Sequence, residues 1–256
     1  MEYKAVFIMS LVMVITMILL LVNESTDNPV SLQVIVINLT RRPDRLDYIR
    51  KSLAVLSIPY IRFSAIDSHK LLDSDYKTVC TGYAYAQIQK NHRTEDKQLS
   101  KGAVGCALSH IAVWKQINRP TLILEDDIDI KHTIPEMQTL IKSAPRDWDI
   151  LLLGWAKPQD GREIFSRNNT KNATWIQLVG FWGLHAYIIK SSTVKKLLDD
   201  VLPLTYQIDT WISDKATEGK IKVYGLRKTI INQRHDIFFT DIQTPLIKNN
   251  QLVPFL

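Results

Sequence analysis

Four carboxylates fall within five positions at the end of a short apolar run. Residues 121–129 read Thr-Leu-Ile-Leu-Glu-Asp-Asp-Ile-Asp, and the apolar part has the length of a buried strand. Carboxylates this close repel one another unless a cation or hydrogen-bond donors compensate for the repulsion. A hard divalent ion such as Mn²⁺ or Mg²⁺, shared with the phosphate oxygens of a substrate, commonly does so. The alternative is a solvated acidic loop.

The segment 38–45, Asn-Leu-Thr-Arg-Arg-Pro-Asp-Arg, is typical of an anion site where a strand turns into a helix. The amides of a helix N-terminus and adjacent guanidinium groups together suit a diphosphate. The same arginines could instead merely cap or flank an exposed helix.

Two further polar residues follow predicted elements. Asp67 ends the segment Ala-Ile-Asp and could accept hydrogen bonds from a ribose or a base, although a turn aspartate is more often a helix cap or turn former. His110 ends the segment 102–110, Gly-Ala-Val-Gly-Cys-Ala-Leu-Ser-His, whose small residues open a helix before the acidic strand. It is either a substrate contact or a core histidine with a satisfied ring.

Strands and helices alternate around these groups, which predicts a three-layer α/β domain with a mostly parallel sheet. Strands at 33–39 and 59–63 flank a helix that begins at Pro43, capped by Thr40, and the three elements form a right-handed βαβ unit. Residues 67–101 are expected to form a long irregular surface excursion. Further strands are predicted at 121–125, 149–153 and 183–189, and further helices at 104–114, 134–141 and 191–198.

The composition is that of an ordinary globular protein, with 46% hydrophobic residues and a formal charge of +6. The basic residues are scattered, without Lys-Arg blocks and interleaved aromatics, which argues against a nucleic-acid partner. A modest basic excess fits an anionic small ligand or a nearby membrane surface. The two cysteines, Cys80 and Cys106, could pair but are too few for a metal framework. Cys106 lies on an apolar helical face and is expected to be a buried, inert thiol.

Residues 5–22 form an uncharged apolar run of about the length needed to cross a bilayer. Lys4 precedes this run and acidic residues follow it, which favours a cytoplasmic N-terminus. We expect a short tail at 1–4, a signal anchor at 5–22, a linker at 23–32 and a domain at 33–256 on the lumenal, non-cytoplasmic side. Glycosylation patterns at Asn168 and Asn172 give weak support. A cleaved signal peptide is the competing interpretation.

A series of short motifs runs through residues 33–236 in a fixed order. They are Ile-Asn-Leu at 37–39 with Arg42 and Arg45, Ala-Ile-Asp at 65–67, Gly-Cys-x-Leu-Ser-His-x3-Trp at 105–114, Leu-Ile-Leu-Glu-Asp-Asp-Ile at 122–128, Trp-Asp-Ile-Leu-Leu-Leu-Gly at 148–154, Gly-x-His-Ala-Tyr at 183–187 and Ile-Asp at 208–209. This series resembles glycosyltransferase family 25, which contains bacterial lipooligosaccharide galactosyltransferases and the collagen galactosyltransferases of animals.

The resemblance implies a GT-A fold and Mn²⁺-dependent (or Mg²⁺-dependent) transfer of a hexose, with inversion, from a UDP-sugar donor to a glycan, glycoprotein or glycolipid acceptor. Glu125, Asp126 and Asp127 would then form the metal and diphosphate site. Asp127 and Asp129 make a second Asp-x-Asp, so the ligand pair stays open. His235 is either a late metal ligand or part of a surface turn.

The same resemblance assigns the nucleotide contacts. Asn38, Arg42 and Arg45 would face the nucleotide, and Asp67 would lie near the uridine or ribose. His110 would complete the donor site.

An inverting displacement also needs a base that takes the proton of the acceptor hydroxyl. Asp209 lies in Tyr-Gln-Ile-Asp-Thr-Trp at 206–211, beside aromatic residues that could stack on a sugar, and is the first candidate. Asp214 is the reserve. Asp209 could instead cap the helix that runs to residue 216.

Two other classes of function remain open. One is a membrane-anchored pseudoenzyme that binds or scaffolds, against which the intact acidic segment 125–127 argues. The other is a metal-dependent phosphate hydrolase, which typically clusters several histidines, whereas the six histidines here do not cluster in the sequence. Collagen specificity does not transfer, because animal collagen galactosyltransferases are much larger than this chain.

Overall fold

The computed structural model describes residues 32–90, 92–158, 162–166, 174–243, 246–248 and 251–253. Within these ranges, no helix combines the length and the apolar character needed to cross a membrane. The predicted anchor at 5–22, and with it the expected tail and most of the linker, lies outside the described residues. The two glycosylation patterns at 168–174 lie outside them as well, apart from residue 174. These expectations therefore stay predictions.

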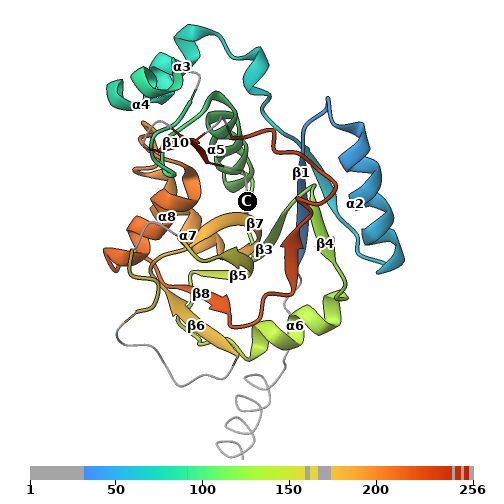
Figure 1. The fold of residues 1–256 in the computed structure, drawn as a ribbon. Coiled ribbons are helices and arrows are strands. Elements are labelled where there is room, and N and C mark those ends of the chain that lie inside the picture. Colours follow the sequence, from blue (N-terminus) through green and yellow to red (C-terminus); the bar gives the residue numbers. More distant parts are fainter. Residues whose placement is uncertain are drawn as a thin grey trace, which may run out of the picture. The chain divides into compact units, whose positions relative to one another are not determined.

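A seven-stranded sheet with the order β2-β1-β3-β7-β5-β8-β6 forms the centre of the described domain (Figure 1). Its strands are β1 (Gln33–Asn38), β2 (Ile61–Ser64), β3 (Thr121–Glu125), β5 (Ile150–Ala156), β6 (Trp175–Leu178), β7 (Trp182–Ile189) and β8 (Val223–Leu226). β1 is parallel to β2 and β3, and β5 is parallel to β8, whereas β7 and β6 are antiparallel to their neighbours. The prediction of a mostly parallel sheet is confirmed for strand direction, with β7 reversed in the middle.

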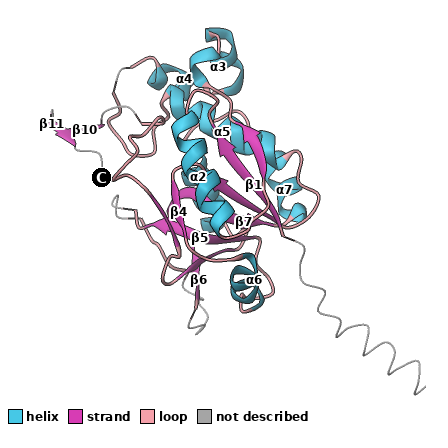
Figure 2. Ribbon diagram, turned by 90° about the vertical axis from the view of Figure 1, so that its right-hand side faces the viewer, coloured by secondary structure: helices cyan, strands magenta, loops and turns pink. Residues whose placement is uncertain are grey.

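Helices cover both faces of this sheet, which confirms the predicted three layers (Figures 1 and 2). One face packs against α5 (Lys101–Trp114), α7 (Ser191–Leu198) and α8 (Ile208–Thr217), and the other against α2 (Pro43–Val55) and α6 (Ile134–Lys142). Because successive strand residues point to opposite faces, Ile35 and Ile37 of β1 enter the first core while Val34 and Val36 enter the second.

The first βαβ unit forms as predicted, but its helix begins differently. Pro43 occupies the first turn of α2, where its fixed φ is favourable and its missing N–H costs nothing. The predicted cap at Thr40 is wrong, because the residue before the helix is Arg42, which makes no side-chain cap. The Thr40 hydroxyl lies 2.8 Å from the Ser64 hydroxyl instead, and so ties the end of β1 to the end of β2.

The segment 67–101 is more regular than expected. It contains the 3-10 turn η1 (Ser68–Lys70) and two short helices, α3 (Asp73–Val79) and α4 (Gly82–Ile88). Tyr76 and Ala84 are buried in the core beside α5. The prediction of an irregular excursion is therefore wrong, because helices of about two turns hold too few apolar positions to show a helical period.

Two small antiparallel pairs complete the described elements. β4 (Ile128–Ile130) pairs with β9 (Ile231–Gln233), and β10 (Leu246–Lys248) pairs with β11 (Gln251–Val253). The first pair matters for the site, because it places the segment after residue 230 beside the acidic turn that follows β3.

The register of the sheet brings the ends of several strands to one edge. Asn38 lies beside Ser64, and Ile37 lies beside Glu125, so the carboxyl ends of β1, β2 and β3 are level. Because β7 is antiparallel to β3, its amino-terminal part around Gly183 lies at the same edge. Ligands of open α/β sheets bind at such an edge.

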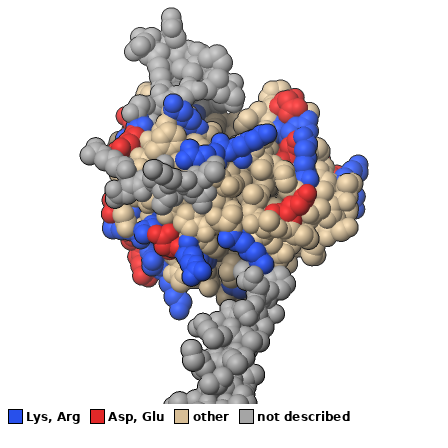
Figure 3. All heavy atoms as spheres, turned by 90° about the horizontal axis from the view of Figure 1, so that it is seen from below, with Lys and Arg blue, Asp and Glu red and all other residues tan. Residues whose placement is uncertain are grey.

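Charged side chains are dispersed over the surface. The face in Figure 3 carries separate groups of Lys and Arg with acidic residues beside several of them, and the described atoms form no continuous basic tract there. This distribution agrees with the scattered basic residues of the sequence.

We predict that Gly154→Ala destabilises the fold while Gly82→Ala does not. A Cβ at Gly154 would lie 2.2 Å from both His185 Nε2 and the Ile231 carbonyl oxygen, whereas nothing lies within 4 Å of a Cβ at Gly82. Urea unfolding should show a loss of about 1–3 kcal/mol for Gly154→Ala. Gly82→Ala should stay within about 1 kcal/mol of the parent, since it sits in a helix. Equal effects of the two substitutions would contradict this packing.

Candidate functional site

A cavity of about 70 Å³ lies at the carboxyl ends of β1 and β3, beside α5. Its walls come from β1, α2, the turn after β2, α5, the end of β3 and residues 241–242. The charged and reactive side chains among its lining residues are Arg41, Arg45, Cys106, His110, Glu125, Asp126 and Asp241. Four candidate site residues from the sequence therefore meet here, namely Arg45, His110, Glu125 and Asp126.

The acidic turn after β3 is bound from β1 and α2. Asn38 Nδ2 donates to Asp126 Oδ2 at 2.6 Å, and Arg45 Nη1 donates to Asp126 Oδ1 at 3.2 Å and to Asp127 Oδ2 at 3.0 Å. All four residues are buried. Asp126 thus has a donor on each carboxylate oxygen, while Asp127 Oδ1 is buried without a hydrogen-bond partner among the described residues.

This incomplete compensation perturbs the titration of the turn. Burial raises the pKa of Asp127 to about 7, and the charge of Glu125 adds to the effect while Arg45 opposes it. Burial also raises the pKa of Asp126. A cation beside Asp127 Oδ1 would satisfy that oxygen and favour the charged carboxylates. The residues therefore fit a hard divalent metal, with Asp127 Oδ1 as the oxygen that lacks a partner and with Glu125 and Asp126, which line the cavity, beside it.

The carboxylate of Glu125 faces an amide group and an imidazole group. Gln233 Nε2 donates to Glu125 Oε2 at 3.2 Å, and His110 Nε2 lies 3.6 Å from Glu125 Oε1. Burial acts to raise the pKa of Glu125, but the neighbouring His110, His185 and Arg45 outweigh it, and the pKa is lowered.

His110 belongs to a buried chain of hydrogen bonds. Trp114 Nε1 donates to the Tyr187 hydroxyl oxygen at 2.8 Å, and that hydroxyl lies 2.9 Å from His110 Nδ1. The hydroxyl proton is then free to bond Nδ1, which leaves Nε2–H facing Glu125. His110 is accordingly both a core residue and a cavity-lining residue. The core interpretation fits its Nδ1 side, which faces Tyr187, and the substrate-contact interpretation stays a prediction for its Nε2 side.

Three arginines converge on a single carboxylate. Arg41 Nη1 lies 2.5 Å from Asp241 Oδ1, Arg45 Nη2 lies 3.4 Å from Asp241 Oδ2, and Arg42 also pairs with Asp241. Arg42 and Arg45 lie 5.8 and 5.3 Å from the centre of the Phe238 ring, which adds cation–π attraction. The guanidinium groups therefore form an anion-binding cluster in which an acidic side chain of the same protein is bound.

Asp67 lies at the border of this cluster. Its carboxylate accepts a hydrogen bond from the His69 amide at 3.1 Å, as the cap of η1, and pairs with Arg41 at 3.2 Å. The turn-capping alternative for Asp67 is thus present in the structure, and its neighbours Ile66 and Ser68 line the cavity.

Asp129 and His235 are not among the residues that line the cavity, and neither are Asp127, Asp209 and Asp214. On β4 the flanking Ile128 and Ile130 point into the core, so Asp129 points the other way, where Lys131 Nζ lies 2.8 Å away. His235 is exposed in the turn after β9. The amide of the preceding residue, Arg234, donates to the Asp127 carbonyl oxygen at 2.7 Å, so this turn is anchored to the acidic segment.

Asp209 is held by backbone amides. Its Oδ2 accepts from the Gly183 amide at 2.8 Å and its Oδ1 from the Thr210 amide at 2.7 Å, in the first turn of α8. Gly183 adopts a φ of +84°, a conformation that favours glycine. Burial raises the pKa of Asp209, and the charge of Glu125 adds to the rise. Asp214 lies further along α8, and burial raises its pKa too.

Several residues of the site were not among the sequence candidates. His185 is buried between Gly154 and Gly183, with Nε2 3.2 Å from the Ile231 carbonyl oxygen, and burial lowers its pKa. The Gly-x-His-Ala-Tyr motif could have pointed to His185, because the strand that carries it, β7, begins at the site. Gln233 and Asp241 carried no signal, because their contacts depend on how the chain returns after residue 230.

Cys106 lies on α5 as predicted, and the expectation of a buried, inert thiol holds in part. It is a free thiol, and burial raises its pKa well above the usual value, as expected of an unreactive group. Its side chain is only half-buried, however, and it lines the cavity. Cys80 is also free and is buried elsewhere.

Comparison with known proteins shows the family of this chain. The model of the family described as glycosyltransferase family 25 (LPS biosynthesis protein) matches residues 31–212. Human procollagen galactosyltransferase 2 is 26% identical over 248 residues, covering 86% of this chain and 38% of that protein. A Bos taurus protein named "Probable inactive glycosyltransferase 25 family member 3" is 28% identical over 180 residues, covering 65% of this chain and 28% of that protein.

Among solved structures, the mouse xyloside xylosyltransferase 1 apo form superposes with a TM-score of 0.33 and 9% identity, over 75% of this chain and 77% of that one. This score is too low to support an argument about function. The chain spans about two fifths of the length of the curated relatives that it matches. Because the family description covers most of the chain, the protein belongs to glycosyltransferase family 25.

We predict that the metal-free protein loses stability as pH rises, through Asp127. The folded pKa of about 7 lies above the usual value of 3.8, so this contribution to stability is full below about pH 4 and is lost as pH rises through about 7. The slope for one such group is at most about 1.4 kcal/mol per pH unit. Asp127→Asn should remove this dependence, and it should stabilise the metal-free protein relative to wild type at pH 8. Urea unfolding in EDTA across this range measures both effects, and parallel pH profiles for the two proteins would refute the assignment.

Proposed function

We propose that this protein is a glycosyltransferase of the GT-A type that transfers a hexose, galactose, from a UDP-sugar to a glycan or to a protein- or lipid-linked acceptor. The transfer is metal-dependent and inverting. One observation carries the proposal: Glu125 and Asp126 of the acidic turn line the same cavity as Arg41 and Arg45 of the arginine cluster, and the adjoining Asp127 has a buried carboxylate oxygen without a partner among the described residues. That combination suits a metal–diphosphate group. Membership of the family and the galactosyltransferase names of its relatives support the class of donor.

The charged groups divide the task of holding the donor. Asp127, with Glu125 and Asp126, would hold a Mn²⁺ or Mg²⁺ ion. Such an ion, when bound, supplies Lewis-acid stabilisation of the charge that develops on the leaving diphosphate. Arg45 Nη1 already bonds the turn that would hold the ion. Its Nη2 donates to the Phe239 carbonyl oxygen and lies 3.4 Å from Asp241 Oδ2, within the arginine cluster. The guanidinium groups are thus preorganised where negative charge grows.

The base that we propose for the acceptor is Asp209. Its raised pKa brings a carboxylate closer to the range in which it accepts a proton effectively. The two backbone amides that it accepts fix its orientation at the start of α8, on the side of the site formed by β7. Asp214 is the second choice, since it is further along the same helix.

A catalytically inactive binding protein is the second candidate. The inactive Bos taurus relative shows that proteins bearing the family name include one described as non-catalytic. In this chain, however, Glu125, Asp126 and Asp127 are all present with their donors in place, which an inactive site has no need to retain.

We also expect the segment 5–22 to place the domain on the lumenal side of a membrane.

We predict that UDP raises the melting temperature in a Mn²⁺-dependent manner. A ligand that binds the folded state stabilises it by mass action, by about 2.7 kcal/mol at 100 times its Kd. Asp127→Ala should abolish the joint UDP–Mn²⁺ shift. Asp129→Asn should keep it, because Asp129 is paired with Lys131 away from the cavity. The reverse ranking of the two variants would move the metal to the second Asp-x-Asp, and a folded protein that ignores all nucleotides would favour the inactive candidate.

We predict that Asp209→Asn lowers kcat by about 100-fold or more, the lower range for loss of a general base. The UDP–Mn²⁺ melting shift should be unchanged, since the donor site is intact. Asp214→Asn serves as the matched variant on the same helix and should retain most of kcat. If Asp209→Asn lowers the melting temperature and the nucleotide shift together, Asp209 acts as a structural cap and not as the base.

A further inference from the structure

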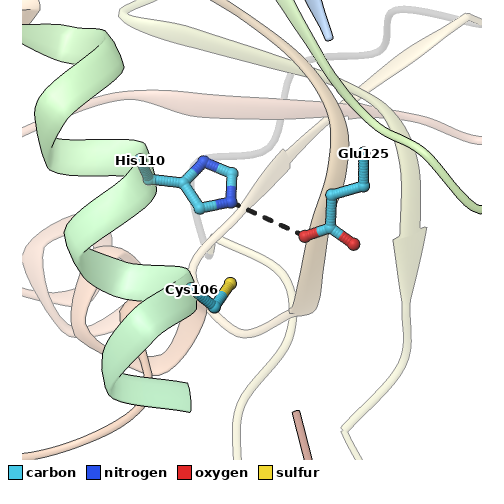
Figure 4. A group of neighbouring side chains, drawn as sticks. All are labelled: Cys106, His110 and Glu125. Atoms are coloured by element: carbon cyan, nitrogen blue, oxygen red, sulfur yellow. Dashed lines mark ion pairs between the residues drawn. The ribbon is translucent and has the colours of Figure 1, made fainter. Parts of the chain in front are cut away.

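A second set of potential ligands lines the same cavity. Two of them, Cys106 and His110, are not used by the proposed transfer, and the third, Glu125, is shared with it. Cys106 Sγ, His110 Nε2 and a carboxylate oxygen of Glu125 all lie within 4.8 Å of one another (Figure 4). Cys106 and His110 are four residues apart on α5 and so project from one face of the helix, while Glu125 ends β3. A helix and a strand hold these three groups, which favours a fixed geometry.

His110 presents an unsatisfied nitrogen to this set. The residue is only 1% exposed, and its Nε2 has no hydrogen-bond partner among the described residues. That nitrogen points toward Glu125 in Figure 4, at 3.6 Å from Oε1. A buried polar atom without a partner costs free energy, which a ligand at this position would recover.

We propose that Cys106, His110 and Glu125 form a site for a borderline-soft divalent ion of the Zn²⁺ class, distinct from the all-oxygen site at Asp127. Thiolate and imidazole ligands select zinc over manganese and magnesium, which prefer oxygen. Three protein ligands leave the fourth tetrahedral position open, toward the cavity that all three residues line.

The distances suit such an ion. Zinc bonds of about 2.0–2.3 Å in a tetrahedral site place neighbouring ligand atoms roughly 3.3–3.6 Å apart. The His110–Glu125 separation of 3.6 Å already has that value. The remaining separations are at most 4.8 Å, so binding of an ion requires them to shorten by about 1 Å.

The surroundings of His110 complete the site. Metal-binding histidines usually donate their other ring N–H to an oriented acceptor. Here the Tyr187 hydroxyl lies 2.9 Å from Nδ1. When Nε2 binds an ion, the ring proton resides on Nδ1 and is donated to the Tyr187 oxygen, whose second lone pair still accepts from Trp114. The Cys106 thiol gives up its proton to solvent on binding.

One consequence rests on the proposed function, whereas the ion site itself does not. Glu125 contributes to both sites, so an ion bound by Cys106 and His110 draws this carboxylate away from Asp127. Zinc should therefore weaken the UDP–Mn²⁺ melting shift of the wild-type protein, and Cys106→Ser should abolish this effect of zinc while keeping the shift.

Cobalt is the probe for the site, because Co²⁺ bound to a thiolate absorbs in the near ultraviolet and shows visible bands in tetrahedral geometry. The full chain, stripped of metal, should bind Co²⁺ stoichiometrically with these bands, and Zn²⁺ but not excess Mn²⁺ should bleach them. Cys106→Ser should lose the thiolate band. Cys80→Ser is the matched control and should keep it, since Cys80 is buried beside Leu204 in an isolated bridge. Tyr187→Phe should weaken Co²⁺ binding by about 10–100-fold.

The outcomes separate this proposal from the proposed function. An absent thiolate band in a wild-type sample with a cooperative melt, or a band that persists in Cys106→Ser, overturns the zinc site even if UDP and Mn²⁺ shift the melt. Cobalt bands that follow the predicted pattern, in a protein that ignores every nucleotide, support the zinc site and count against the transferase.

Discussion

Repulsion among the three neighbouring carboxylates at 125–127 is the constraint on which the site depends. Asn38 of β1 and Arg45 of α2 offset this repulsion by donating hydrogen bonds to Asp126. They precede Asp126 by 88 and 81 residues in the sequence. A buried guanidinium between carboxylates gives little net stability, because desolvation offsets the attraction, but removing one partner leaves an unpaired buried charge. The packing of β1, α2 and β3 therefore depends on hydrogen bonds to the charged turn. Asp127 Oδ1 is the carboxylate oxygen of Asp126 and Asp127 that receives no such bond among the described residues.

The reversed strand β7 decides what else faces this turn. A parallel strand at that position would bring its carboxyl end to the acidic edge, whereas β7 brings its amino-terminal half. Two residues of β7, Gly183 and Tyr187, bond to side chains of the neighbouring helices. The first holds Asp209 through its amide, and the second holds His110 through its hydroxyl. One strand thus fixes α8 and α5 relative to the acidic turn.

The parts of this arrangement that could be predicted are those with long local patterns. The strand at 33–39, the helix that follows it and the acidic strand each carry enough apolar positions to show their period. The helices within 67–101 are too short for that. Gln233 and Asp241 were beyond sequence reasoning, because they reach Glu125 and Arg41 from 108 and 200 residues away. The sequence could not decide between Glu-Asp-Asp at 125–127 and Asp-x-Asp at 127–129, whereas in the structure the alternation of β4 turns Asp129 away from the core.

Glu125, at the end of β3, has oxygen-rich groups on one side and an imidazole and a thiol on the other. On one side it meets the amide of Gln233 and the carboxylates of the turn, which are oxygen-rich surroundings suited to a hard cation. On the other side it meets the imidazole of His110 and the thiol of Cys106. A serine at position 106 would leave this side without a soft ligand. Because α5 and β3 fix both sides, an ion bound on either side would determine which set of ligands Glu125 joins.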